Sequence, residues 1–597
     1  MKTNKFLLGI LTAGAMFASC SNELPGNEQP ENGGKGEKSF MSVAIKQANS
    51  SFTRSTTDGG YAQGTYEENA VNTLSFFFFK SDGNPFELGT GIVNAHGSKE
   101  AEGDAPNKTD AVDEATYNRN LYQITLPTGT DKNDNVDSEY DATLVIEHNV
   151  GNIPAAIVAV INHPTPANLK DKTIAELKAL TLTAQPGNAK FVMCNSVYKN
   201  AAGSIAMETP ITADNLGKNA EEALANPVDI YVERVAARVD VKAGFTTTAN
   251  PDGAYPVGKT IKFSDATDAD VYAKILGWDI NTYADKTNLI KDIDGNASWN
   301  LGWTWNNAAD FRSYWADNVV GLTPIMNFTW ANLQGQGINA LPGTDYCYEN
   351  TTTPTQVLIG GVYDRVESRK YNTKVLVKAE IQDEYGNVLK FANWYGQNYK
   401  ADSDNSYSTF KGVVANSLKN KLVKLVGGSY TPITAADIEL SQGSGDPTEN
   451  EDSYKVYFEF STAGEAATWY YLDDDNTYKA YPTTGTGTAA EVLKATEPAR
   501  IWNGMAYYFV NIEHLGAVGE ANDGLDTDNY IKGYYGVVRN HAYELTFTDI
   551  SGLGTPVYNG TQDIPWPVEP DMTESFIAAK IKVLAWKWIK KDVVLGK

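Results

Sequence analysis

The chain consists largely of short apolar runs, each bounded by glycine, asparagine, aspartate or proline. Leu74–Phe79 ends at Ser81-Asp82-Gly83, Ala156–Ile161 ends before the turn at Pro164, and Lys374–Ile381 is a third such run. Runs of about four to eight residues that are rich in β-branched and aromatic side chains predict strands rather than helices. The sequence therefore predicts a mostly β protein of antiparallel β-sandwiches with small helical insertions.

Two segments, residues 168–180 and 416–426, carry leucine or isoleucine at intervals of three or four instead. Side chains at this spacing lie on one face of a helix, so we expect a short helix in each segment. The region from Asp279 to Asn350 is rich in tryptophan and asparagine and shows no period. We expect extended loops there.

The alternation of apolar and polar residues changes phase once in the first half of the chain. Apolar side chains occupy even positions in Pro227–Val232 and odd positions from Val235 to Val241. A change of phase at Glu233-Arg234 predicts a bulge or a strand that passes between two sheets. We place a domain boundary just after it, at residues 243 and 244. A length of 597 residues, 42% of them hydrophobic, predicts two or three units, because β domains commonly span ~200–250 residues.

The N-terminus has the features of an export signal. Lys2 and Lys5 precede an apolar run that ends at Ser19, directly before Cys20. Small residues before a cysteine are typical of a lipoprotein signal, in which the cysteine becomes the acylated first residue, although Phe17 stands where leucine is usual. The alternative is an ordinary signal peptide with an incidental cysteine. The polar, Gly- and Pro-rich stretch after Cys20 predicts a flexible tether.

The charge and the cysteines narrow the classes of partner and of fold. A net charge of −25 argues against nucleic acid or anionic lipid as a partner, since both need a positive face. Beyond Cys20 the only cysteines are Cys194 and Cys347. They are either one disulfide or two buried free thiols, and the fold does not depend on a dense disulfide framework.

The sequence predicts no catalytic residue, no metal site and no cofactor. The five histidines have no metal-ligand spacing, and no G-x-S-x-G, P-loop or dinucleotide motif is present. His541 follows Arg539 in an apparent strand, where we expect a structural role. The acidic stretches Asp292–Asn296 and Asp473–Asn476 are expected to be turns, because the glutamate that would complete a calcium loop is absent. A carboxylate pair for glycoside hydrolysis stays open, since nothing singles one out.

Short segments along the whole chain resemble the fimbrillins of type V pili, and within them the minor (short-fimbria) fimbrilin family. The signal ending at Cys20 is one of them, and the stretch from Lys38 to Arg54 follows it. The others are Phe191–Ser196, Val232-Glu233-Arg234, Ile275–Asp279, Phe311–Ala316, Glu349-Asn350-Thr351, Tyr535–Tyr543 and Gly552-Leu553-Gly554. The resemblance implies two transthyretin-like β-sandwich domains and a structural rather than enzymatic role.

The resemblance also implies a mode of assembly. A lipoprotein precursor reaches the outer membrane, and an Arg-specific protease cuts after an arginine behind the first strand. Removal of that strand opens a groove, which a strand from another subunit fills. Here the cut falls between Arg54 and Ser55, in a polar loop that a protease can reach. The alternative is that Arg54 is an ordinary solvated loop residue. The removed segment is predicted to be a short edge-type strand with the side chains Phe40, Met41, Val43 and Ile45.

The C-terminus offers a strand to donate. Residues 578–595 contain no proline or glycine and carry apolar side chains on one face and partly on the other. Such a strand is stabilised by pairing, and an unpaired edge invites strand addition. The predicted donor side chains are Ile581, Val583, Leu584, Trp586, Trp588, Ile589, Val593 and Leu595. The alternative, and the commonest fate of such a segment, is a final strand of the subunit's own sheet.

The sequence therefore predicts a shaft subunit of a surface fimbria that supports cell adhesion, with copies of itself or related subunits as partners. The rivals are a tip or accessory adhesin of the same pilus and a monomeric surface glycan-binding lipoprotein; a surface hydrolase has the least support. The predicted organisation is residues 1–19 signal peptide, 20–37 lipidated tether, 38–54 removed strand, 55–243 N-terminal β-sandwich, 244–577 C-terminal β-sandwich with long loops, and 578–597 donor strand.

Overall fold

The computed structural model describes most of the chain, with gaps. The described residues are 38–47, 61–63, 68, 73–87, 96–99, 115–125, 140–147, 154–183, 191–196, 198–199, 205–212, 215–217, 226, 228–292, 316–325, 338–352, 358–359, 362–363, 371–443, 454–512, 514, 536–559 and 577–587. The predicted mostly β fold with few short helices is confirmed. The predicted lipidation and cleavage residues Cys20, Arg54 and Ser55 lie outside these ranges.

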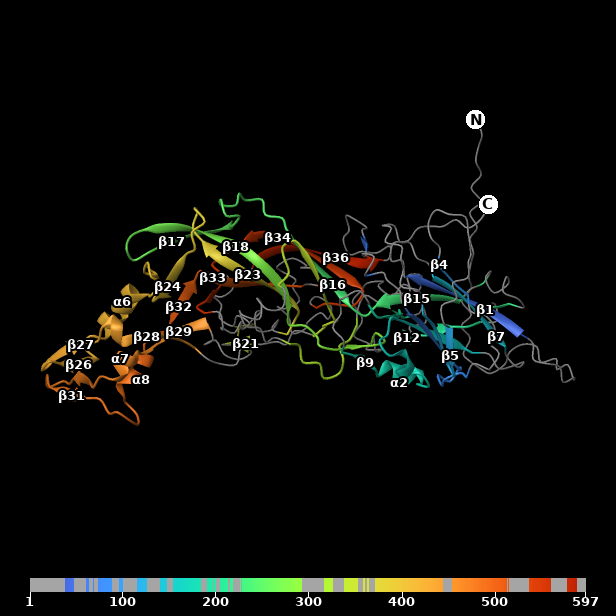
Figure 1. Ribbon diagram of the computed structural model, residues 1–597, viewed down its shortest axis with the longest axis horizontal. Coiled ribbons are helices and arrows are strands. Elements are labelled where there is room, and N and C mark those ends of the chain that lie inside the picture. Colours follow the sequence, from blue (N-terminus) through green and yellow to red (C-terminus); the bar gives the residue numbers. More distant parts are fainter. Residues whose placement is uncertain are drawn as a thin grey trace, which may run out of the picture.

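An eleven-stranded sheet, called the first sheet below, lies at one end of the elongated molecule (Figure 1). Its buried strands come from the apolar runs of the sequence, so that Phe76 to Phe79 and Ile157 to Ile161 are almost completely inaccessible to solvent. The strand order is β4 (His96–Lys99), β7 (Tyr140–Glu147), β1 (Lys38–Gln47), β15 (Val228–Arg234), β10 (Met193–Asn195), β8 (Ala156–Ile161), β3 (Thr73–Phe79), β6 (Leu121–Thr125) and β5 (Ala115–Asn118), with β13 (Thr209–Pro210) beside β8 and β14 (Leu216–Gly217) beside β1.

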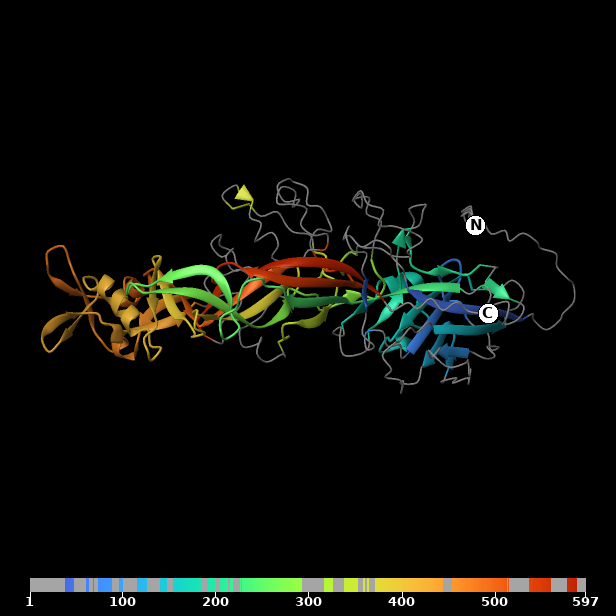
Figure 2. The ribbon, with the colours of Figure 1, turned by 90° about the horizontal axis from the view of Figure 1, so that it is seen from above.

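Two five-stranded sheets form the middle of the molecule, called the second sandwich below (Figure 2). Their facing sides enclose one cluster of buried side chains, among them Val239, Tyr543, Trp278 and Val377. One sheet has the order β2 (Tyr61–Gln63), β36 (Ile577–Lys587), β34 (His541–Ile550), β16 (Ala237–Ala243) and β20 (Gly343–Cys347); the other has β17 (Tyr255–Lys262), β18 (Asp268–Asn281), β23 (Lys374–Gln382), β33 (Met505–Asn511) and β35 (Thr555–Val557).

Residues 390–503, called the distal region below, form a separate buried cluster at the end opposite the first sheet (Figure 1). A five-stranded sheet, a four-stranded sheet and three helices enclose it. Their bounds are β25 (Gln397–Lys400), β24 (Lys390–Trp394), β32 (Ala499–Asn503), β29 (Lys455–Phe460) and β28 (Ile438–Gln442); β27 (Ser429–Pro432), β26 (Val423–Val426), β30 (Trp469–Leu472) and β31 (Tyr478–Ala480); and α6 (Ser408–Leu418), α7 (Thr462–Glu465) and α8 (Ala489–Lys494).

The remaining elements are short. Their bounds are α2 (Ile174–Lys178), the 3-10 turns η1 (Pro166–Leu169) and η3 (Ala435–Asp437), and the strand pairs β9 (Thr181–Leu182) with β19 (Thr287–Asn288), β11 (Tyr198–Lys199) with β12 (Ile205–Ala206), and β21 (Leu358–Ile359) with β22 (Val362–Tyr363). Among the helices that the structure describes, none is long and apolar enough to cross a membrane.

Several sequence predictions are confirmed. The phase change at Glu233-Arg234 is the point where the chain leaves β15 in the first sheet and enters β16 in the second sandwich. Of the two alternatives that the sequence left open for Cys194 and Cys347, the structure has two buried free thiols, which belong to different buried clusters. The sequence treats 244–577 as one domain; its described residues contribute to three buried clusters, in the second sandwich, in the distal region and, through residues such as Leu289 and Val538, in the cluster that includes the first sheet.

One helix prediction is wrong, and another is too long. In residues 416–426 the helix α6 already ends at Leu418, and Val423–Val426 is the strand β26. Gly427 and Gly428 adopt positive φ angles of 58° and 86°, which turn the chain into a hairpin, so that the apparent helical spacing is fortuitous. In residues 168–180 only Ile174–Lys178 is α-helical. Of the predicted loop region, 293–315 and 326–337 lie outside the described residues.

Candidate functional site

The first strand, β1, lies inside the first sheet and not at its edge. It pairs antiparallel with β7 from Lys38↔Glu147 to Ile45↔Tyr140, and parallel with β15 from Val43↔Val228 to Gln47↔Val232. Along the described sheet, β7 and its neighbour β4 join the other strands only through β1. The prediction of an edge-type strand is therefore wrong. The pattern of Phe40, Met41, Val43 and Ile45 defines two faces of a strand, but it cannot tell how many neighbours the strand has.

The other terminal strand, β36, has one long-range neighbour over most of its length. It pairs antiparallel with β34 from Ile577↔Ile550 to Ala585↔His541. On its other side the short strand β2 pairs with it only from Tyr61↔Ala585 to Gln63↔Lys587. Residues 577–587 thus form a strand of the subunit's own sheet, as the alternative prediction held. The predicted donor residues Ile581, Val583, Leu584 and Trp586 lie in β36, whereas Trp588, Ile589, Val593 and Leu595 lie outside the described residues.

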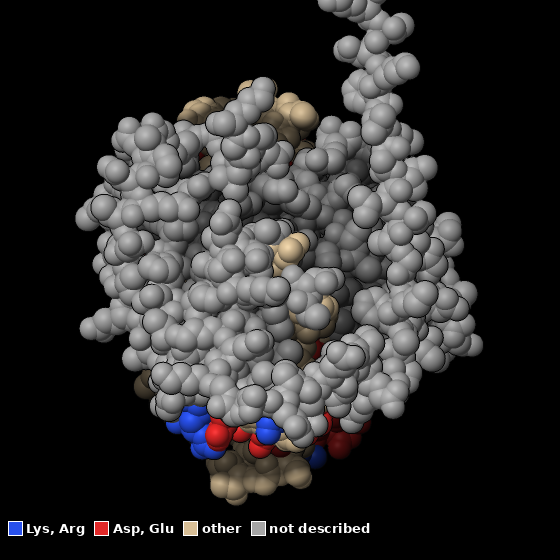
Figure 3. All heavy atoms as spheres, turned by 90° about the vertical axis from the view of Figure 1, so that its right-hand side faces the viewer, with Lys and Arg blue, Asp and Glu red and all other residues tan. Residues whose placement is uncertain are grey.

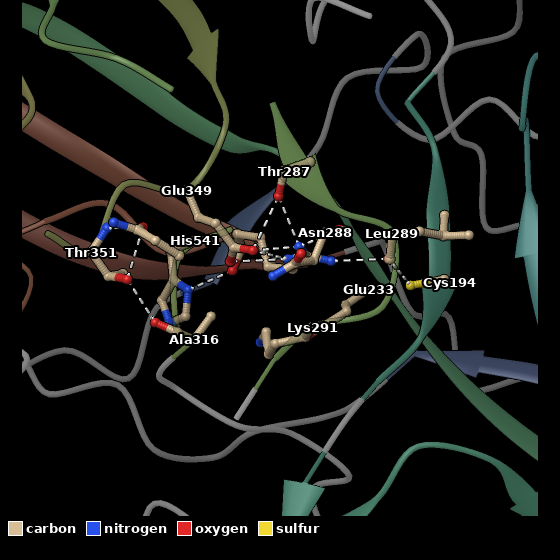
Figure 4. A network of polar contacts seen from close by, with 12 residues as sticks. Cys194, Glu233, Thr287, Asn288, Leu289, Lys291, Ala316, Glu349, Thr351 and His541 are labelled. Atoms are coloured by element: carbon tan, nitrogen blue, oxygen red, sulfur yellow. Dashed lines mark hydrogen bonds and ion pairs between the residues drawn. The ribbon is translucent and has the colours of Figure 1, made fainter. Parts of the chain in front are cut away.

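A buried polar network joins the first sheet to the second sandwich (Figure 4). Its centre is Arg539, which precedes β34 and is completely buried. The Arg539 Nε donates to both carboxylate oxygens of Glu349 at 3.0 Å, Nη1 donates to the Leu289 carbonyl at 3.1 Å, and Nη2 donates to Thr287 Oγ1 at 2.9 Å. Burial opposes the charge of the guanidinium, yet Glu349 keeps the pKa of Arg539 above its ordinary value. Arg539 therefore holds the segment that contains β19 in place through hydrogen bonds from its charged guanidinium.

The first sheet contributes two members of the same network (Figure 4). Glu233, in β15, forms an ion pair of 2.9 Å with Lys291, and both side chains are completely buried. Cys194, in β10, donates its thiol hydrogen to the Leu289 carbonyl at 3.0 Å, and burial raises the pKa of that thiol to about 12. The thiol is therefore neutral and packs as a small hydrogen-bonding side chain rather than as a nucleophile.

Two further motifs, around Asn350 and Gly536, complete the network on the side of the second sandwich. Asn350 Nδ2 donates to the carbonyls of Thr282 and Tyr371, at 3.1 and 2.9 Å, and Thr351 Oγ1 donates to the Ala316 carbonyl at 2.8 Å. Gly536 adopts a φ of 117°, and a Cβ there would lie 2.6 Å from the Asn350 carbonyl oxygen. Glycine is needed at this close approach. Five of the segments that resemble the fimbrillins thus meet at one place, where they contribute Cys194, Glu233, Ala316, Glu349 with its two neighbours, and Arg539.

A second cluster fixes the chain between β2 and β3. The carboxylate of Glu68 accepts hydrogen bonds from Arg238 Nη1, at 3.2 Å, and from the hydroxyl of Tyr346. The Glu68 carbonyl accepts one from Arg234 Nε at 3.1 Å, and burial lowers the pKa of Arg234 to about 9. Sequence reasoning missed Glu68 and Lys291, because a charged residue outside the apolar runs gives no sign of the distant partner that buries it.

No arrangement for catalysis is evident in the described part of the chain. Within those ranges no group of three or more His, Cys, Asp or Glu side chains is placed to hold a metal ion. Asp473 accepts hydrogen bonds from the backbone of Asp475 and Thr477 and pairs with Lys479, as in an ordinary turn. His541 Nδ1 donates a hydrogen bond to the Arg539 carbonyl at 2.8 Å, and its ring meets that of His514 edge-on. Figure 3 views the molecule from the end that carries the first sheet. Among the residues that the structure describes, lysine and arginine side chains lie beside aspartate and glutamate side chains on this face.

Comparison with known proteins places these features in context. Residues 501–592 match the family described as major fimbrial subunit protein type IV, fimbrillin, C-terminal. This range contains Arg539, His541 and both strands of the β34–β36 pair. No curated protein matches the sequence.

Similar solved structures have low sequence identity. A candidate cell adhesion protein from Parabacteroides distasonis is 11% identical, with a TM-score of 0.34 over 93% of this chain and 99% of that one. One from Bacteroides eggerthii is 10% identical, with a TM-score of 0.32 over 93% and 98%. The C-terminally truncated tip fimbrial protein Mfa3 from Porphyromonas gingivalis is 10% identical, with a TM-score of 0.32 over 92% and 100%. Scores of this size do not establish a shared fold. It is through its C-terminal region, residues 501–592, that the chain is similar to the fimbrillins, a family of fimbrial subunits.

Proposed function

We propose that this protein is a structural shaft subunit of a surface fimbria, assembled by strand exchange between subunits. The observation that carries the proposal is the position of β1. This strand is hydrogen-bonded on both sides, yet the next described residues, the three of β2, belong to a different sheet. Loss of β1 would leave the facing edges of β7 and β15 without partners, and two such edges bind an incoming strand.

Cleavage after Arg54 would separate β1 from the remainder of the chain and leave the contacts of β2 and Glu68 in place. Residues 48–60 connect β1 to β2, and they contain one arginine and no lysine. A cut at Arg54-Ser55 would release β1, while β2 stays paired with β36 and Glu68 stays bonded to Arg238 in the second sandwich and to Arg234 at the end of β15. The new N-terminus would then be held close to the C-terminal strand. An Arg-specific protease is the maturation partner that this proposal requires.

The C-terminal segment is the proposed replacement for β1. β1 is 10 residues long, and the segment after β36, from Trp588 to Lys597, has a similar length. It carries Trp588, Ile589, Val593 and Leu595. β36 can therefore remain paired with β34 while the following residues enter the next subunit, or β36 itself can detach and add Ile581, Val583, Leu584 and Trp586 to the donated strand. Burial of such side chains contributes about 1.5–3 kcal/mol each, before the cost of ordering the segment.

The remaining parts of the proposal concern the route to the surface. Cys20 would anchor the precursor in the outer membrane through its lipid, and cleavage would release the mature subunit into the fimbria. The minor fimbrilin family is the subfamily that we propose, with other copies or related subunits as partners. The domain limits at residues 243 and 577 belong to the same proposal. A tip or accessory subunit is the alternative, and it would lack the ability to donate its C-terminus.

The test is controlled cleavage of the soluble chain, residues 21–597, with an Arg-specific protease. We expect a cut at Arg54-Ser55 by mass spectrometry, followed by SDS-resistant ladders and filaments in size-exclusion chromatography and electron microscopy. The Arg54→Lys variant keeps the charge and should stay uncut and monomeric. Deletion of the residues after Ala585 should permit the cut and prevent the polymer. A chain that resists cleavage at Arg54, or is cut there and remains monomeric, contradicts the shaft role.

A further inference from the structure

The four-stranded sheet of the distal region lies at the far end of the molecule from the first sheet (Figures 1 and 2). Its order is β27, β26, β30 and β31, and it consists of two antiparallel hairpins. The two faces of this sheet differ in composition. Register assigns each side chain to a face, because directly paired residues, and residues two apart in a strand, lie on the same side.

One face of the sheet packs on the distal core. Trp469 stacks on Phe460 with ring centroids 4.8 Å apart, and its Nε1 donates to the Gly464 carbonyl at 2.8 Å. Lys424, which pairs with Trp469 across the strands, forms an ion pair with the buried Asp437. On this inner face the polar groups of Trp469 and Lys424 bond to the core, while Lys479, on the same side, is exposed and pairs with Asp473.

The opposite face, called the tyrosine face below, is apolar. The paired positions Leu425↔Tyr430, Val423↔Pro432, Val423↔Tyr470, Tyr470↔Ala480 and Leu472↔Tyr478 all lie on it. The rings of Tyr430 and Tyr478 stack with their centroids 3.9 Å apart, and Tyr470 meets Tyr430 edge-on at 5.2 Å. These contacts confirm that the three rings share one side. None of the side chains on this face is charged.

Most of the tyrosine face is open to solvent in the described structure, whereas Val423, on the same face, is buried. Leu425 is 48% exposed, Leu472 40%, and Tyr430 and Tyr478 38% each. Apolar side chains exposed singly are ordinary on a protein surface, whereas these four are neighbours on one face. Tyrosine is well suited to such a surface, because its ring is rigid and apolar while its hydroxyl can hydrogen-bond to a ligand.

The size of the face decides what kind of ligand it fits. Strands of four residues are roughly 13 Å long, and the outer of four strands lie roughly 14 Å apart, so the face covers about 200 Å². A stable protein–protein interface buries about 800 Å² on each partner. The face is thus too small for a second copy of the chain. Its lack of charge, on a chain of net charge −25, also excludes a ligand that is held by ion pairs.

We propose that the tyrosine face is a binding site for a neutral carbohydrate. The C–H face of a sugar ring would lie on the ring pair Tyr430–Tyr478, and its hydroxyls would bond to the tyrosine hydroxyls. Leu425 and Leu472 would border the bound ring. The site is independent of strand exchange, since it lies in the distal region. The proposal adds a direct adhesive contact to each subunit, beyond the structural role in the fibre.

The test uses the uncleaved soluble chain, residues 21–597, so that assembly does not affect it. The probe is a panel of immobilised oligosaccharides, neutral ones built from glucose, galactose, mannose and N-acetylhexosamines beside sialylated and sulfated ones. We expect binding to one or more neutral members. Tyr430→Ala/Tyr478→Ala should weaken it by about tenfold or more, and Tyr430→Phe/Tyr478→Phe, which keeps the rings, by a smaller factor. Tyr385→Ala removes a tyrosine that is 73% exposed elsewhere and should have no effect.

Circular dichroism of each variant shows whether the fold is kept, and Leu472→Lys places a charge on the face without removing a ring. We expect this variant to bind more weakly as well. Absence of binding to every neutral probe overturns the proposal, as does undiminished binding by both the alanine and the Leu472→Lys variants. Self-association of the chain that the alanine variant abolishes, without any carbohydrate binding, would assign the face to a protein contact instead.

Discussion

The two terminal strands of the described chain differ in how they are held. β1 pairs at eight positions with β7 and at five with β15, whereas β36 pairs over most of its length with β34 and at three positions with β2. Removing an interior strand opens two edges at once, but removing an edge strand opens one. Loss of β1 would therefore cost the first sheet more pairing than loss of β36 would cost the second sandwich, and in the proposed strand exchange it is β1 that another strand would replace.

The largest effect is expected when the position of β1 stays empty. A chain of residues 55–587 lacks both β1 and the segment after β36. Each lost backbone hydrogen bond contributes about 1 kcal/mol, and we expect the first sheet to melt roughly 10 °C or more below that of the chain 21–597. Scanning calorimetry measures the melting, and hydrogen exchange at Val228–Arg234 assigns it to the first sheet. The chain 21–587, which keeps β1, is the control and should melt as the longer chain does. Equal melting of all three chains would show that β1 is dispensable.

The next effect concerns the network that joins the two regions. Glu349→Ala leaves Arg539 buried without its carboxylate, and breaking a buried ion pair in this way costs about 3–5 kcal/mol. Urea unfolding should show this loss in the transition of the second sandwich. Replacement of both partners, Glu349→Leu with Arg539→Met, removes the unpaired charge and should recover much of the loss. A single variant that loses less than about 1 kcal/mol would mean that water reaches Arg539.

The smallest effect is a pH dependence confined to the second sandwich. Burial, and then the nearby Asp345, raises the pKa of Asp279 from 3.8 to about 6. The folded protein therefore holds this proton more tightly than the unfolded chain does. The resulting stability is present below pH ~4 and is lost as the pH rises to about 6. Asp279→Asn should remove this fall and stabilise the protein by roughly 2 kcal/mol at pH 7. Urea titrations between pH 4 and 7 measure the free energy of unfolding. If it changes with pH by the same amount in the Asp279→Asn variant and in the unaltered protein, the assignment to Asp279 is contradicted.

Much of the fold was predictable from local pattern. The runs Leu74–Phe79, Ala156–Ile161 and Lys374–Ile381 are the strands β3, β8 and β23, because β-branched and aromatic runs of that length have few other solutions. The passage between sheets at Glu233-Arg234 followed from a change in alternation.

What failed depended on distant partners. β1 looks like an edge strand in sequence because its neighbours, β7 and β15, lie far along the chain. Leu422 and Leu425 are spaced as in a helix, but the Gly427-Gly428 turn pairs their segment with β27. The motif that contains Arg539 was found, but its role was not, since the carboxylate of Glu349 and the carbonyl of Leu289 reach it only in the folded chain.

The most direct test of strand exchange places the donated strand and the position that receives it in two different chains. The donor is the Arg54→Lys chain of residues 21–597, which keeps β1 and its C-terminus. The acceptor is a chain that ends at Lys587 and is cut after Arg54, so that it can receive a strand but lacks the segment from Trp588 onward that the donor supplies. Their mixture is examined by size-exclusion chromatography with mass measurement. The account predicts a 1:1 complex that does not grow, and neither chain alone should associate. A mixture in which both chains stay monomeric, or an acceptor that dimerises with itself, would contradict the account of strand exchange.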